Sequence, residues 1–361
     1  MLDFGTPPKP RVVSLHLAPV KTTAVYDSYW RFATERQRIF YRRHLGQAGP
    51  WTDNSVLGTY KFTNAYRASD RVSQYLIRHV IYRDDLPSTA EEVVFRTLLF
   101  KLFNKIETWE LLERKIGPIS FETYRFRDYD RILSAAMAKG ISIYSAAYIM
   151  PPGSSAFGQK AKHQNHLMLL ESMMSDGLPL RIATARTMQQ AFELLLSYPT
   201  IGDFLAYQFV TDINYSEVTD FSERDFVVPG PGARDGLRKC FADNGGLSDA
   251  ELIRLMADRQ NEECARLGLE FASLWGRPLQ LIDCQNLFCE VDKFARVAHP
   301  EASGLTGRTR IKQKFSANGG AIEFWYPPKW GINERIEAGA LPNEATATSP
   351  TFDPARGRED I

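Results

Sequence analysis

Cysteine and histidine are scarce in this chain, and neither forms a recognisable metal or redox pattern. Four cysteines and six histidines occur among 361 residues, with no CxxC pair. The cysteines are Cys240, Cys264, Cys284 and Cys289. Sparse thiols without paired spacing are typical of a reducing compartment, so we expect buried free thiols and no metal site. His163 and His166 share a short stretch without an evident acidic or cysteine partner, and a solvated basic helix start is the favoured interpretation.

Long apolar runs and an excess of one charge are missing as well. No stretch of eighteen apolar residues occurs, so we expect no membrane span. The start MLDFGTPPKPRVV is rich in proline and does not resemble a signal peptide. Lys and Arg number 44 against 43 Asp and Glu, so the net charge of +1 gives no general attraction to nucleic acid, although a local basic face would still bind it. We expect a soluble, cytoplasmic protein without a cofactor, and we leave its oligomeric state open.

Several catalytic motifs are also absent. The sequence contains no GxxxxGK[ST], no GxSxG, no HExxH and no HxE…PCxxC of the zinc deaminases. These absences argue against phosphoryl transfer through a P-loop and against hydrolase, protease and deaminase chemistry of those types.

Helical periodicity dominates the chain, whereas strand signals are few and short. The expected helices cover residues 25–45, 62–82, 86–104, 106–115, 121–139, 163–175, 184–196, 247–269 and 280–297. Ser248 and Glu251 have the spacing of a capping box. The prediction is an all-α fold, either one compact unit or two helical lobes around a cleft. We expect an extended arm at 1–21, a helical domain at 22–335 and a disordered tail at 336–361.

The segment YPTIGDFLAYQFV, residues 198–210, interrupts the helical pattern with a tight turn. Pro199 ends the preceding helix, Ile201 can fill the core, and Gly202 allows backbone angles that larger residues avoid. The pattern is close to the helix-hairpin-helix consensus L-P-G-[IV]-G, with Thr200 in place of the first glycine. In such a hairpin the free N–H groups of the second helix bind a DNA phosphate. We expect Thr200, Ile201 and Gly202 to bind DNA, and the alternative is a plain turn between helices.

An acidic turn follows the second hairpin helix. In helix-hairpin-helix DNA glycosylases a catalytic Asp lies between the hairpin and a further helix, and here Asp225 precedes the helix that Pro231 is placed to start. A carboxylate there can stabilise the cation that forms when a base leaves its sugar, or orient the attacking water. Asp225 is therefore the expected catalytic residue, with Asp220 and Asp212 as alternatives. Phe204 occupies the position of the lyase lysine, so we expect no Schiff-base step.

Longer segments spread over most of the chain resemble one family. They are YKFTNAYRASDRVSQYLIRHVIY, LFNKIETWELL, IGDFLAYQFVTDINYS, DFVVPGPGARDGLRKCF, FCEVDKFARV and YPPKWGINE. Between residues 55 and 335 the chain resembles the helical domain of 5-hydroxymethyluracil DNA kinases, a family similar to DNA glycosylases and linked to hypermodified thymine in phage DNA. The resemblance implies that kinase members add a P-loop domain, which we do not find here, so kinase activity does not carry over. It also implies kinship with a bacterial anti-phage glycosylase that removes glucosylated 5-hydroxymethylcytosine.

Polar residues in these segments are candidates for contacts with DNA. The expected base pocket consists of Asn64, Arg67, Gln208, Asp212 and Asn214. Spacing also places Arg67, Asp70, Arg71 and Gln74 on one helix face. Such groups can bind a flipped base, and the alternative is a buried salt-bridged network that fixes helix packing. Gln285, in CQNLFCEVDKF, has either a base contact or a surface role. In the basic run RTRIKQKF we expect Arg308, Arg310 and Lys312 to contact phosphates.

The expected function is a monofunctional DNA glycosylase. It would remove a hydroxymethylated or glucosylated pyrimidine from phage DNA and leave an abasic site, in anti-phage defence. Its partner would be double-stranded DNA that carries modified bases. One alternative is a transferase or accessory factor in the hypermodification of thymine in phage DNA. Another is a DNA-binding module without enzymatic activity.

Overall fold

The protein is predominantly helical in the part that the structure describes. The computed structural model describes residues 18–147, 150–316, 323–337 and 339. Within these ranges α-helices predominate and there is one two-stranded sheet, so the prediction of an all-α fold is confirmed. The expected arm (1–21) and tail (336–361) fall almost wholly outside the described residues. No helix among the described residues is long and apolar enough to cross a bilayer.

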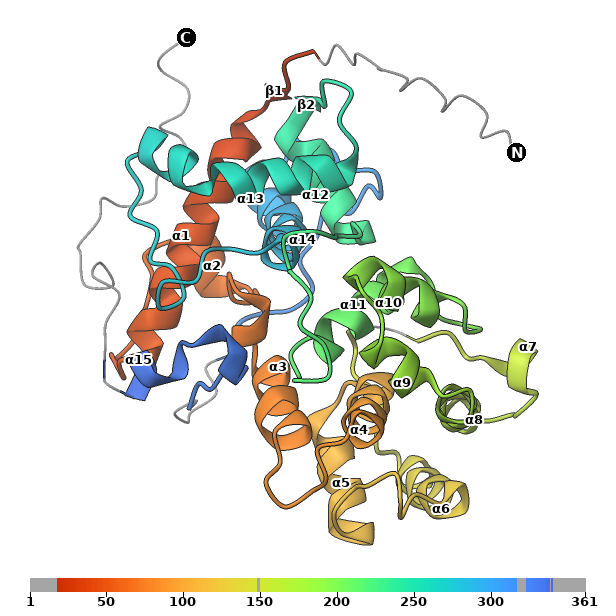
Figure 1. The fold of residues 1–361 in the computed structure, drawn as a ribbon. Helices are drawn as coiled ribbons and strands as arrows, with labels where there is room; N and C mark the ends of the chain where they lie inside the picture. Colours follow the sequence, from red (N-terminus) through yellow and green to blue (C-terminus); the bar gives the residue numbers. More distant parts are fainter. Residues whose placement is uncertain (1–17, 148–149, 317–322, 338, 340–361) are drawn as a thin grey trace, which may run out of the picture.

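One group of helices surrounds α14, near the centre of Figure 1. Its members are α1 (Ala24–His44), α2 (Ser55–Thr59), α12 (Pro231–Cys240), α13 (Asp249–Arg266) and α14 (Leu281–Ala298), with strands β1 (Lys21–Thr22) and β2 (Phe241–Asp243) at one end. The strands are antiparallel and pair Thr22 with Phe241. Because α1 packs against both α12 and α14, the start and the later part of the chain form one core.

Helices α12 and α14 approach each other closely because α12 has a glycine at the contact. A Cβ atom built on Gly236 would lie only 2.1 Å from the carbonyl oxygen of Phe288. Nearly one turn further along α12, the buried Lys239 ammonium lies 2.9 Å from a carboxylate oxygen of Asp292 on α14. The backbone contact and the buried ion pair together fix the position of α12 on α14.

A second group of helices surrounds α4 (Ala90–Phe103), which is buried along most of its length. Its members are the 3₁₀ turn η1 (Arg67–Ser69), α3 (Arg71–Leu76), the π-helical turn η2 (Ile77–Ile81), α5 (Ile106–Ile116), α6 (Phe126–Ala138), α7 (Ser154–Phe157), α8 (Lys162–Ser175), α9 (Leu178–Ala183), α10 (Met188–Leu196) and α11 (Asp203–Ile213). The short elements η3 (Pro328–Trp330) and α15 (Asn333–Glu337) follow near the end of the described chain. Figure 1 shows the two groups one above the other, with the chain between α11 and α12 running from one to the other.

The predicted helix starts agree with the structure where the sequence contains a capping motif. Ser248 and Glu251 form the expected capping box of α13, and Pro231 occupies the first turn of α12. The single helix expected over 62–82 is wrong, because Asp70 adopts extended backbone angles between η1 and α3. Arg67 and Arg71 therefore do not share a helix face: Arg67 is buried, whereas Arg71 is exposed.

Candidate nucleic-acid interface

The turn at residues 198–202 joins α10 to α11, two helices that pack against each other. Tyr198 and Ile201 are buried beneath the turn, and Gly202 is the N-cap of α11 without a side-chain cap. Contrary to the expectation from sequence, the left-handed residue is Thr200, with φ of 69°, whereas Gly202 has φ of −94°. No atom lies within 4 Å of a Cβ built on Gly202. Gly202 therefore keeps the start of α11 open, which is what an anion at a helix N-terminus requires.

Thr200 is strained, since a β-branched residue at positive φ clashes with its own backbone. Its hydroxyl is also buried without a hydrogen-bond partner. We expect Thr200→Gly to stabilise the protein by about 1 kcal/mol and to raise Tm by about 1–2 °C. Thr184→Gly, at the negative-φ cap of α9, is the matched control and should bring no gain. A lower Tm for Thr200→Gly in a thermal melt would show that the packing of its methyl group outweighs the strain.

Three residues expected in the base pocket form a buried ionic cluster instead of lining a surface. The Arg67 guanidinium donates to both carboxylate oxygens of Asp212, at 2.6 and 3.0 Å, and to Gln208 Oε1 at 3.0 Å. It also donates to the Tyr215 hydroxyl at 2.9 Å, and the Lys101 ammonium lies 3.0 Å from Asp212 Oδ2. Burial by itself would raise the pKa of Asp212, but Arg67 and Lys101 outweigh it and hold that pKa below its usual range. The cluster therefore ties η1 to α4 and α11.

The two asparagines of the expected pocket organise their own loops. Asn64 is half-buried; its carbonyl oxygen accepts from Arg36 at 3.1 Å and its amide donates to the Ser69 carbonyl at 2.7 Å. Asn214 is buried and its carbonyl oxygen accepts from the Thr219 hydroxyl and from the backbone N–H of Phe221. In this state the amide groups of both residues are engaged with the protein.

The acidic turn contains carboxylates in different surroundings. Asp225 is exposed, and its hydrogen bonds are made by its backbone: the carbonyl oxygen accepts from Arg254 at 2.8 Å and the N–H donates to the Ser222 carbonyl at 3.5 Å. The side chain of Asp220 is 89% exposed, with Lys329 at 4.0 Å. Glu223 is largely buried and pairs with Arg277 at 2.7 Å. Of the three expected catalytic candidates, Asp225 and Asp220 are therefore exposed to solvent, whereas Asp212 is buried.

The basic run 308–314 is a surface segment outside the helices, with one antiparallel bridge between Lys314 and Tyr60. Its end pairs with residues 59–61: Lys61 N–H donates to the Gln313 carbonyl at 3.0 Å, and Phe315 N–H donates to the Thr59 carbonyl at 2.9 Å. The exposed basic side chains are Arg308, Arg310, Lys312 and Lys314. They alternate with Thr309, with the half-buried Ile311 and with Gln313, so the chain places a cation at every second position.

A hollow of about 690 Å³ lies beside η2, and its charges are balanced. Its walls include Arg78, Arg83 and Trp325. Arg78 pairs with Glu323 at 2.9 Å, and Arg83 pairs with Asp85 at 2.7 Å and with Glu113 at 2.6 Å. Since each arginine already has a carboxylate, we assign no anionic ligand to this hollow.

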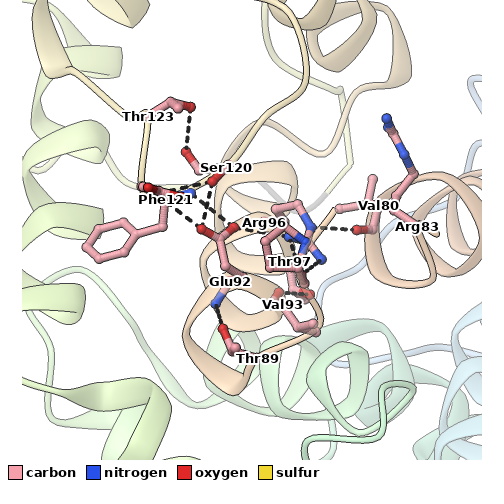
Figure 2. Close-up of polar contacts among 12 residues, drawn as sticks. Val80, Arg83, Thr89, Glu92, Val93, Arg96, Thr97, Ser120, Phe121 and Thr123 are labelled. Carbon is pink, nitrogen blue, oxygen red and sulfur yellow. Dashed lines mark hydrogen bonds and ion pairs between the residues drawn. The ribbon is translucent and has the colours of Figure 1, made fainter. Parts of the chain in front are cut away.

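A buried polar network holds η2 against α4 and was missed from the sequence (Figure 2). The Glu92 carboxylate accepts from the Ser120 hydroxyl at 2.7 Å, from Phe121 N–H at 3.1 Å and from Arg96 at 3.1 Å. Arg96 in turn donates to the Val80 carbonyl at 3.0 Å. The i, i+4 spacing of Glu92 and Arg96 was the available signal.

His163 and His166 are buried, so the expected solvated helix start is wrong. His163 Nε2 lies 2.8 Å from Asp130 Oδ1, and His166 Nε2 lies 2.8 Å from the Pro151 carbonyl. Burial lowers the pKa of His166 to about 4. Within the described ranges no group of three or more His, Cys, Asp or Glu side chains could hold a metal ion. The cysteines are free, and three of the four are buried.

Comparison with known proteins identifies relatives over most of the chain. The model of the family "5-hmdU DNA kinase, helical domain" matches residues 23–304. The 5-hmdU DNA kinase of Bacillus phage SP10 is 28% identical over 301 residues, which cover 78% of this chain and 46% of the relative. The chain thus spans about half the length of that relative. No solved structure matches the chain.

These findings overturn the prediction of base excision. The relative is a kinase, an enzyme class that transfers phosphoryl groups and does not hydrolyse the bond between base and sugar. The predicted DNA glycosylase and its hydrolytic role in defence are therefore wrong, and the reaction for which Asp225, Asp220 or Asp212 was chosen no longer applies. The reason is that a hairpin and an acidic turn indicate contact with DNA and not a particular reaction. The transferase alternative agrees better with the relatives, and the chain belongs to the family of the helical domain of 5-hmdU DNA kinases.

Proposed function

We propose that this chain performs the DNA side of phosphoryl transfer to 5-hydroxymethyluracil in DNA. In this role it binds the duplex and presents the modified base, whose hydroxymethyl oxygen would accept the phosphoryl group. The observation that carries the proposal is the match of residues 23–304 to the helical domain of such kinases. The proposal assigns no site for the phosphoryl donor, because the sequence has no GxxxxGK[ST] loop to hold its phosphates.

Two surface features support binding to the DNA backbone. The open start of α11 at Gly202 offers free N–H groups to a phosphate. The surface segment 308–314 adds four exposed cations with no acidic residue between them. In an extended chain every second side chain lies on the same face, about 6.6 Å apart. Such a row can follow a phosphate backbone although the protein as a whole has a net charge of only +1.

The proposed function is tested with duplexes that differ at one position, which carries thymine, uracil, 5-hydroxymethyluracil or 5-hydroxymethylcytosine. Binding is measured by fluorescence anisotropy, and each duplex is then incubated with the protein and ATP and examined by mass spectrometry. Preferential binding of the 5-hydroxymethyluracil duplex supports the proposal, and the added mass of a phosphoryl group would extend it to the whole reaction. Equal binding of all four duplexes without phosphorylation overturns it.

Replacing Arg308, Arg310 and Lys312 together by alanine should weaken binding to every duplex alike. Each lost phosphate contact lowers the slope of log Kd against log salt by about 0.9, so three contacts lower it by about 2.7. The matched control removes the same charge from exposed residues of the other helix group, in Arg114→Ala, Lys115→Ala and Arg127→Ala combined. An unchanged slope in the first triple variant, measured by anisotropy between low and moderate salt, would remove this segment from the interface.

A further inference from the structure

Two buried glutamines at the junction of the helix groups have unused hydrogen-bonding groups. Gln208 on α11 and Gln285 on α14 are fully buried. Gln208 Nε2 and Gln285 Oε1 each lack a hydrogen-bond partner. A buried polar group without a partner costs about 1–3 kcal/mol, so it is retained in a protein where something else compensates for it.

The orientation of the Gln208 amide is fixed by its neighbour. Its Oε1 accepts from the Arg67 guanidinium, which has only N–H donors, so the unused group of Gln208 is the donor Nε2. Gln285 Nε2 is directed to the Cys289 sulfur at 3.3 Å, which leaves its carbonyl Oε1 as an unused acceptor. The junction therefore offers one donor from α11 and one acceptor from α14.

Contacts around Gly230 place the Gln285 amide beside Phe204, in the first turn of α11. A Cβ built on Gly230 would lie 2.8 Å from the Phe204 ring and 3.7 Å from Gln285 Nε2. Phe204 and Gln208 share a face of α11, because they are one turn apart. Gly230 is also the N-cap of α12, which begins without a side-chain cap. The glycine keeps clear the space between the aromatic ring and the Gln285 amide.

Residues next to Gln285 are partly exposed to solvent. Phe204, Gly232 and Cys289 are half-buried, and a Cβ built on Gly232 would lie 3.1 Å from the Cys289 sulfur that Gln285 contacts. Phe204 belongs to the first turn of α11, two residues after the N-cap Gly202. A phosphate held at that N-cap would place its own nucleotide next to Phe204.

We infer that Gln208 and Gln285 together bind the Watson–Crick edge of one pyrimidine, turned out of the duplex beside Phe204. Uracil presents a carbonyl oxygen next to N3–H, which complements the Gln208 donor and the Gln285 acceptor. Phe204 supplies an aromatic surface for the ring, as in other sites that bind an unstacked base. The inference rests on the proposed function, because that function supplies the modified pyrimidine.

The test uses the full chain and anisotropy with the four duplexes described above. Gln285→Met removes the unused acceptor, so it should leave Tm unchanged or higher while reducing the preference for 5-hydroxymethyluracil roughly 10- to 100-fold. Gln37→Met is the matched control, since Gln37 on α1 is also buried with an unused amide nitrogen but lies away from α11. A Gln285→Met protein that keeps the full preference would overturn the inference.

A second measurement changes the base and needs no variant. In wild-type protein, N3-methylation of the 5-hydroxymethyluracil removes the N3–H and also weakens its pairing in the duplex. If the edge is bound, affinity falls by a similar factor; if it is not bound, the unpaired base binds as well or better, and the inference is wrong. If the wild-type protein prefers none of the duplexes that carry a modified base, the proposed function itself is contradicted. Failure of the proposed function can therefore be distinguished from failure of the inference about the two glutamines.

Discussion

Asp212→Asn should destabilise the protein by about 3–5 kcal/mol, because it leaves two buried cations without their carboxylate. Asp212 is fully buried, binds Arg67 through both oxygens and lies 3.0 Å from Lys101. The amide that replaces it preserves the shape and one carbonyl oxygen but carries no charge. The measurement is urea unfolding at neutral pH, with the free energy extrapolated to water.

Lys101→Met is the informative comparison for Asp212→Asn. It removes one of the two cations and leaves the pair of Arg67 with Asp212 intact, so the remaining charges cancel. Replacing a buried ion by an apolar group of similar length is often neutral or stabilising, and we expect a change below about 1 kcal/mol. If Lys101→Met destabilised the protein as much as Asp212→Asn, the cluster would depend on all three charges and not on the pair.

Gly236→Ala should destabilise the protein by about 3 kcal/mol or more, although alanine is the better helix former by about 1 kcal/mol. A Cβ on Gly236 would lie 2.1 Å from the Phe288 carbonyl oxygen and 2.8 Å from its carbonyl carbon. Backbone atoms of α14 cannot rotate away as a side chain can, so α12 must move off α14. The loss is measured as a lower urea midpoint.

Gly58→Ala is the control for Gly236→Ala. Gly58 lies in α2, and no atom lies within 4 Å of a Cβ built there, so alanine should stabilise by up to about 1 kcal/mol. If Gly236→Ala lowers the free energy of unfolding and Gly58→Ala raises it, the loss is due to the contact between α12 and α14. A neutral Gly236→Ala would mean that α12 and α14 separate at little cost.

Helix caps were readable in the sequence, whereas the partners of buried charges were not. Ser248 with Glu251 and Pro231 are local signals, and the structure follows them. The cluster around Asp212 brings together residues from η1, α4 and α11, and no spacing along the chain predicts that meeting. Periodicity also failed at 62–82, where Asp70 interrupts the helix and the apolar pattern continues through the break.

The hairpin illustrates why a motif predicts a shape better than a reaction. The turn between α10 and α11 lies where the sequence placed it, yet Thr200 carries the backbone angle that the consensus gives to glycine. A reaction depends on which groups face the base, and the pair that we propose, Gln208 and Gln285, comes from helices far apart in the sequence. The unused carbonyl of Gln285 is recognisable only after α14 is placed beside Gly230.

Arg67 also restricts how the two halves of the molecule can move. Its backbone N–H donates to Asp283 of α14 at 2.8 Å, while its side chain binds Asp212 of α11. One residue thus belongs to the cores of both helix groups. A displacement of α11 relative to α14 must therefore either carry Arg67 with both partners or break one of these two bonds.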